Sequence, residues 1–140
     1  MAKTICRILG VVFLLVGLMG FIKPDLMGTH LSMAHNLIHI VSGILALYFG
    51  FAGTLRGARG FCIAFGLVYL LLAVLGFVLG TDQASSLPGM AAMGTDTRLW
   101  KVIPGTLELG TMDHIVHILL GALFLIGGLL TKEDVRRAVD

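Results

Sequence analysis

Charged residues are scarce in this chain of 140 residues: they make up 13% of it, whereas 57% is hydrophobic. A soluble domain carries on the order of 25% charged residues. A chain this apolar has too little polar surface to cover a globule, so we expect lipid to surround much of it. The net charge of +2 gives no reason to expect a nucleic-acid partner.

Cysteines and catalytic motifs are also few or missing. Cys6 and Cys62 form no Cys-x-x-Cys, so no redox or zinc-finger framework is readable, and we expect buried thiols. The chain has no Gly-x-Ser-x-Gly, P-loop, dinucleotide fingerprint or His-Glu-x-x-His. We therefore favour a protein that is not an enzyme. A metal-activated water would be the one credible route to hydrolysis.

Long apolar runs are the main feature that is present. A membrane-spanning helix needs about 20 mostly apolar residues. The sequence predicts a single all-α transmembrane domain over 1–140, a four-helix bundle whose spans cover 5–22, 33–53, 61–80 and 113–131. No charge falls in the middle of a span.

The connectors indicate the orientation. Basic residues gather at one side of the predicted membrane, which places both termini in the cytoplasm. The predicted cytoplasmic side has the basic residues Lys3, Arg7, Arg56, Arg59, Lys132, Arg136 and Arg137. The outer side has Lys23, Arg98 and Lys101. The loop 81–112 then lies outside, and its apolar cluster predicts packing on the membrane surface with Trp100 as an anchor. A short amphipathic helix, capped by Thr131 and Asp134, is expected at the end of the chain.

An internal duplication relates the spans in pairs. A shift of 56 residues places Cys6 on Cys62, and a shift of 78 places His39 on His117. The repeat units would be 1–58 and 59–140. Both units then run in the same direction, which implies a pseudo-two-fold axis along the membrane normal.

The predicted second and fourth spans each begin with a polar pair. His35 and His39 are four residues apart, as are Asp113 and His117, so each pair shares one helix face. If the two helices face each other, these four side chains converge. Three imidazoles and a carboxylate form a plausible site for zinc, iron or another transition metal.

Four more residues surround this set. Asn36 and His114 stand three positions before the matched histidines, and Gly43 and Gly121 lie one turn deeper, where small residues allow close packing. An interhelical hydrogen-bond cluster of Asn36, His39, Asp113, His114 and His117 would explain the same residues without a ligand. Haem held axially by His39 and His117 is a further alternative. His30 lies in a connector, where we expect it to be exposed.

These segments resemble a bacterial family of four-span membrane proteins described only as a domain of unknown function. The resemblance covers nearly all of the chain except the middle of the loop 81–112. The family commonly has Asn where this chain has His114. The shared marks are the run from Gly10 to Phe21, His35-Asn36-x-x-His39-x-x-x-Gly43, the run from Gly66 to Gly76, and Asp113-x-x-x-His117-x-x-x-Gly121.

The resemblance implies a fold and a bacterial inner-membrane location, and no activity. The sequence thus predicts a membrane protein whose outward-facing site binds a metal ion or a small ligand. A structural or accessory subunit is the alternative. The lipid bilayer is the expected partner, and a homo-oligomer or a partner membrane subunit is left open.

Overall fold

The computed structural model describes residues 1–132, except for the side chain of Ala91. It contains four long helices: α1 (Ala2–Gly20), α2 (Met33–Phe51), α3 (Leu55–Leu79) and α4 (Thr111–Leu129). All four are long and apolar enough to cross a membrane. Between 28% and 39% of each apolar window is buried, so most of each helix surface is left for lipid.

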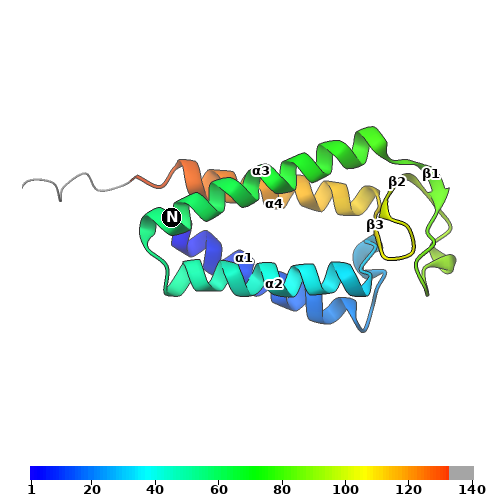
Figure 1. The fold of residues 1–140 in the computed structure, drawn as a ribbon, viewed down its shortest axis with the longest axis horizontal. Coiled ribbons are helices and arrows are strands. Elements are labelled where there is room, and N and C mark those ends of the chain that lie inside the picture. The colour runs from blue at the N-terminus through cyan, green and yellow to red at the C-terminus, as the bar shows by residue number, and fades with distance from the viewer. Residues whose placement is uncertain (133–140) are drawn as a thin grey trace, which may run out of the picture.

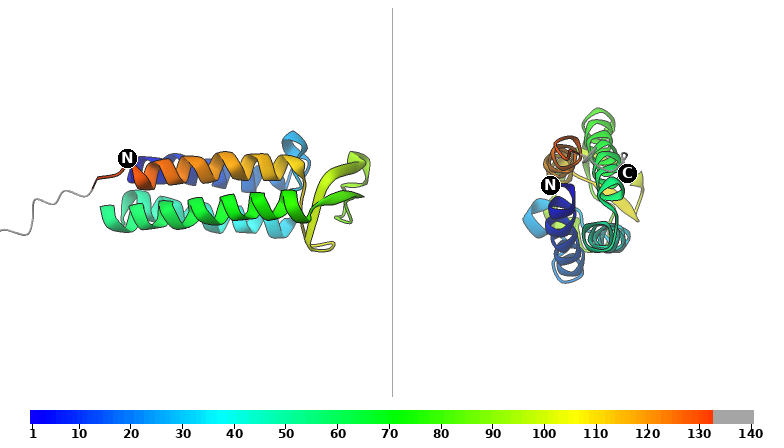
Figure 2. Two further views of the ribbon diagram at one scale, coloured as in Figure 1. Left: turned by 90° about the horizontal axis from the view of Figure 1, so that it is seen from above. Right: turned by 90° about the vertical axis from the view of Figure 1, so that its left-hand side faces the viewer.

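The helices form two adjacent pairs, α1 with α2 and α3 with α4, as Figures 1 and 2 show. Glycines allow the close approach inside each pair. A Cβ on Gly43 would lie 2.9 Å from the carbonyl oxygen of Gly10, and one on Gly121 would lie 3.0 Å from that of Gly66. Aromatic side chains fill the centre, where Phe13 stacks on Phe124 at 6.0 Å between ring centroids.

The two pairs also meet near the end that carries the N-terminus. Cys6 Sγ and Cys62 Sγ lie 3.4 Å apart, and both residues are fully buried as free thiols. Each thiol faces a carbonyl of the other helix, Cys6 that of Ala58 and Cys62 that of Ala2. This end therefore joins α1 to α3 directly.

The predicted all-α fold is corrected in the loop 81–112, which contains β-strands. It forms a three-stranded antiparallel sheet of order β1-β2-β3, with β1 at Thr81–Ala84, β2 at Thr95–Ile103 and β3 at Leu107–Leu109. The sequence of β2 is rich in β-branched and aromatic residues, which favour strands. A turn that contains Gly105 at φ 71° returns the chain to β3. The sheet stands on one end of the bundle, here called the sheet end (Figure 1).

Two short 3-10 helices complete the chain, η1 (Leu26–Gly28) and η2 (Ala91–Met93). The helix α3 begins six residues before the predicted span, because Thr54 caps it by accepting a 3.0 Å hydrogen bond from Gly57 N. The predicted C-terminal helix after Thr131 lies outside the described residues. Thr131 itself accepts a hydrogen bond from Ala2 N, which ties the end of α4 to the start of α1.

Candidate metal site

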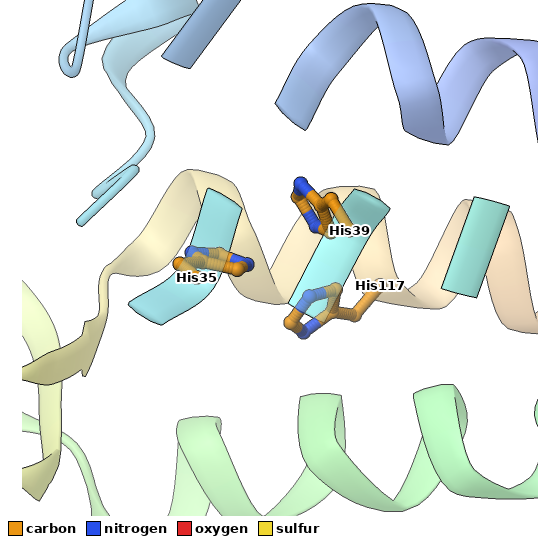
Figure 3. A group of neighbouring side chains, drawn as sticks. All are labelled: His35, His39 and His117. Atoms are coloured by element: carbon orange, nitrogen blue, oxygen red, sulfur yellow. The ribbon is translucent and has the colours of Figure 1, made fainter. Parts of the chain in front are cut away.

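Three imidazoles meet at the sheet end of the bundle. His35 and His39 come from α2 and His117 comes from α4, and one nitrogen of each lies within 4.8 Å of the others. Figure 3 shows the three rings gathered together. The exposed fractions of the three residues are 3%, 6% and 3%, so the group is closed to solvent.

Helix geometry explains the arrangement. His35 and His39 are one helical turn apart, and their ring centroids are separated by 4.4 Å. Ser32 caps α2 by accepting a hydrogen bond from His35 N, which fixes the first turn of the helix. His39 packs on Phe13 and His117 packs on Tyr69, with ring centroids 5.5 and 5.1 Å apart.

Hydrogen bonding leaves imidazole nitrogens available. His35 Nδ1 lies 2.9 Å from the carbonyl oxygen of His30, so Nδ1 carries a proton and donates it. In the tautomer that donates from Nδ1, the lone pair is on Nε2. His39 Nδ1 and His117 Nδ1 are buried without a hydrogen-bond partner among the described residues. Unpaired buried nitrogens are unfavourable unless something binds them.

The carboxylate of Asp113 lies beside His30 and His35 and is not a member of the three-imidazole group. Its Oδ2 accepts hydrogen bonds from His30 N at 3.0 Å and from Gly110 N at 2.8 Å. Its Oδ1 is 3.9 Å from His35 Nδ1. Asp113 therefore caps α4, holds the connector between α1 and α2, and places a negative charge beside the imidazoles.

The expectation that His30 is exposed is wrong. His30 is 2% exposed, and its Nδ1 lies 3.4 Å from Asp113 Oδ2. The reason is a long-range contact, because α4 places the carboxylate of Asp113 against His30 in the connector between α1 and α2. The one signal in the sequence is the shortness of the connector, which keeps His30 within two residues of the helix cap Ser32.

Asn36 and His114 each reach the neighbouring helix of their own pair. Asn36 Nδ2 is 3.4 Å from the carbonyl oxygen of Leu31, and its Oδ1 packs on Gly20 of α1. His114 Nε2 bonds the carbonyl oxygen of Arg98 at 2.8 Å, and its ring packs on Gly76 of α3. Similarly, Gly43 packs on α1 and Gly121 packs on α3, as described above.

A comparison with family models places residues 3–130 in the family described as "Domain of unknown function (DUF4383)". The matched range contains α2, α3, α4, all of α1 except Ala2, and the three histidines. A search of curated proteins and a search of solved structures gave no match. Since the match covers most of the chain, this protein belongs to that family of unknown function, and its helices agree with a four-span membrane protein.

Proposed function

We propose that this membrane protein binds one transition-metal ion between His35, His39 and His117. The observation that carries the proposal is the convergence of three buried imidazole nitrogens within 4.8 Å from two helices. Imidazole is a good ligand for zinc, copper, iron and nickel. The ring orientation supports this role, because His35 already donates its other nitrogen to a carbonyl, as metal-binding histidines do.

The geometry fits a single ion after a small adjustment. Zinc–nitrogen bonds are about 2.0–2.1 Å long, so two nitrogens on one tetrahedral ion lie about 3.3 Å apart. The imidazole nitrogens lie within 4.8 Å of one another, so side-chain rotations that move each nitrogen by roughly an ångström bring them to this separation. Asp113 supplies a negative charge near the ion without joining the three nitrogens, which lowers the electrostatic cost of a buried cation.

The other ligands and activities have less support. Haem needs a wide flat slot, whereas His39 packs on Phe13 and His117 packs on Tyr69. A hydrolase would need a coordination position open to water, and none of the three histidines is more than 6% exposed. These observations favour a binding role over a hydrolytic one at this site.

A structural role is the second candidate, and one observation favours it. Asp113 joins the connector before α2 to the start of α4 through two buried backbone N–H groups. In this reading the imidazoles only lock α2 to α4. A partner membrane subunit or a second copy would then use the exposed helix faces.

Metal analysis separates the two candidates. The chain is purified without chelators, incubated with zinc or iron(II), desalted and measured by elemental mass spectrometry. We expect about one metal ion per chain, at least tenfold less in His39→Ala and His117→Ala, and no loss in the control His114→Ala, which removes a buried imidazole outside the group. Near-zero metal in the unchanged chain under all loadings contradicts the proposal, and a Soret band would favour haem.

We further propose a bacterial inner-membrane location with both termini in the cytoplasm and the metal site facing outward. The N-terminus and the α2–α3 connection lie at the end opposite the sheet (Figure 1). Lys3 and Arg7 follow the N-terminus, and Arg56 and Arg59 follow that connection. Single cysteines added at Thr54 and at Thr106 to a cysteine-free variant test this in intact cells. An impermeant maleimide should label Thr106→Cys alone, and labelling of Thr54→Cys would reverse the orientation.

We also propose that 1–58 and 59–140 are two copies of one two-helix unit, related by the pseudo-two-fold axis. Matched contacts support this. Gly10 approaches Leu47 as Gly66 approaches Leu125, and Gly43 approaches Gly10 as Gly121 approaches Gly66. In this view His39 and His117 are symmetry mates, and the sheet is an insertion in the second copy.

A further inference from the structure

A cavity of about 490 Å³ lies at the sheet end, where α1 stops and α2 starts. The end of α1 contributes Phe21 and the start of α2 contributes Met33, Ala34 and Leu37. The segment between β1 and β2 contributes Leu87 and Met90 on another side. The three histidines of the proposed metal site do not line this cavity, so it is a separate feature.

One side of the cavity belongs to the lipid-facing surface. Phe21, Met33 and Leu37 are 47%, 71% and 51% exposed, and they stand at the ends of helices that are apolar enough to cross a membrane. The other side is covered by the protein, because Leu87 and Met90 are only 5% and 1% exposed. The cavity therefore adjoins the surface that lipid covers, while Pro88, Gly105 and Thr106 at another edge are exposed.

The corresponding residues of the second helix pair contact one another and the sheet. A shift of 56 residues places Gly20 and Phe21 on Gly76 and Phe77, and a shift of 78 places Asn36 on His114. There the imidazole of His114 packs on Phe77 at 5.2 Å between ring centroids and bonds the backbone of β2. In the first pair, Phe21 and Asn36 instead line the cavity.

Most of the lining of the cavity is apolar, so an apolar ligand gains the most by covering it. The volume of about 490 Å³ falls within the roughly 300–1,000 Å³ that is usual for small-ligand sites. We propose that the cavity binds one long acyl chain of a membrane glycerophospholipid, which enters from the bilayer beside Leu37.

The test uses the full chain in nanodiscs and a phosphatidylethanolamine that carries a diazirine at the end of a palmitoyl chain. After irradiation, mass spectrometry locates the adducts. We expect them to concentrate on 31–37 and 87–90. Unlabelled dipalmitoyl phosphatidylethanolamine should displace the probe from these segments at least tenfold better than the dioctanoyl form.

Two variants fill the cavity from opposite sides, Ala34→Trp on α2 and Pro88→Trp in the covering segment. Each should reduce the adducts on these segments at least tenfold, while the control Ala64→Trp, on an exposed face of α3, should not. Circular dichroism and the elution volume in size-exclusion chromatography verify that each variant folds. One folded cavity variant is enough for the test. Adducts spread evenly over all lipid-facing helices, equal displacement by both chain lengths, stronger displacement by an isoprenoid alcohol, or an equal loss in Ala64→Trp would overturn the proposal.

Discussion

At the scale of single residues, glycines decide which side chains can reach the helix interfaces. Gly20 and Gly76 leave room for the side chains of Asn36 and His114, which press against the helix backbone. Gly60 on α3 has nothing within 4 Å of where its Cβ would stand. The same residue type therefore has different roles at these positions, and substitution separates them.

We expect Gly76→Ala to lower stability and Gly60→Ala to raise it. The added methyl group at Gly76 overlaps the ring of His114, which is fully buried and held by the carbonyl of Arg98, so overpacking should cost about 1–3 kcal/mol. At Gly60 only the helix preference remains, which favours alanine by about 0.5–1 kcal/mol. Thermal unfolding followed by circular dichroism in one detergent measures both, and similar shifts in the two variants would refute the explanation.

At the scale of elements, carboxylates fasten the sheet and the connector to the helices. Asp113 accepts hydrogen bonds from two buried backbone N–H groups. Asp96 of β2 accepts hydrogen bonds from the backbone N–H and the hydroxyl of Thr111, at the start of α4. Burial raises the pKa of Asp96, but its hydrogen bonds from Thr111 and Arg98 outweigh that effect and lower the pKa overall. These contacts place the start of α4, and His117 with it.

Asp113 offers a test of its role as a clamp. Asp113→Ala leaves the N–H groups of His30 and Gly110 buried without an acceptor, at about 1–3 kcal/mol each. Asp113→Asn keeps an oxygen in place, so its melting temperature should fall less. We also expect Asp113→Asn to retain the metal that His39→Ala loses. If Asp113→Asn loses the metal as completely, the carboxylate is itself a ligand.

Glu108 of β3 makes the sheet sensitive to acid. Burial raises the pKa of Glu108, but donors from Gly105, Ser86 and Ser85 outweigh it and lower the pKa to about 2, from an ordinary value of 4.5. A carboxylate whose pKa is lowered by folding stabilises the fold at pH values above its ordinary pKa. Its contribution should therefore be complete above pH 4.5 and disappear as the pH falls towards 2.

The fluorescence of Trp100, the one tryptophan of the chain, follows this loss because Trp100 pairs with Leu109 beside Glu108. Its emission should change between pH 4.5 and 2. Glu108→Gln lacks the charge at every pH, so its emission at neutral pH should already be shifted and the acid change should shrink. An identical titration in both proteins would show that Glu108 does not hold the sheet.

At the scale of the whole molecule, the two helix pairs are joined by a central aromatic core and by the thiol contact. Phe13 of α1 contacts both Tyr69 of α3 and Phe124 of α4. The proposed metal site takes two histidines from the first pair and one from the second. Neither pair therefore contains the whole site.

A split chain tests this arrangement. We expect fragments 1–53 and 54–140, expressed together in one membrane, to purify as a complex through a tag on either fragment, because each pair packs internally before the pairs meet. The complex should bind metal, and the single fragments should bind at least tenfold less. Full metal binding by the second fragment alone would contradict the site.

The sequence by itself determined the features that depend on local patterns. Four apolar runs of sufficient length predicted the four helices, since a spanning helix needs little beyond its own residues. The spacing of His35 and His39 predicted a shared helix face. The histidine at 117 was paired with them by internal similarity, and the structure brings the three together.

Only the tertiary structure decided the features that depend on long-range contacts. The buried position of His30 and the capping role of Asp113 arise because α4 meets a connector more than 80 residues away in sequence. The sheet depends on pairing between β1, β2 and β3. The apolar residues of this loop were equally compatible with the predicted packing on a membrane surface. The cavity exists because separate segments leave a space unfilled, which no pattern within one segment records.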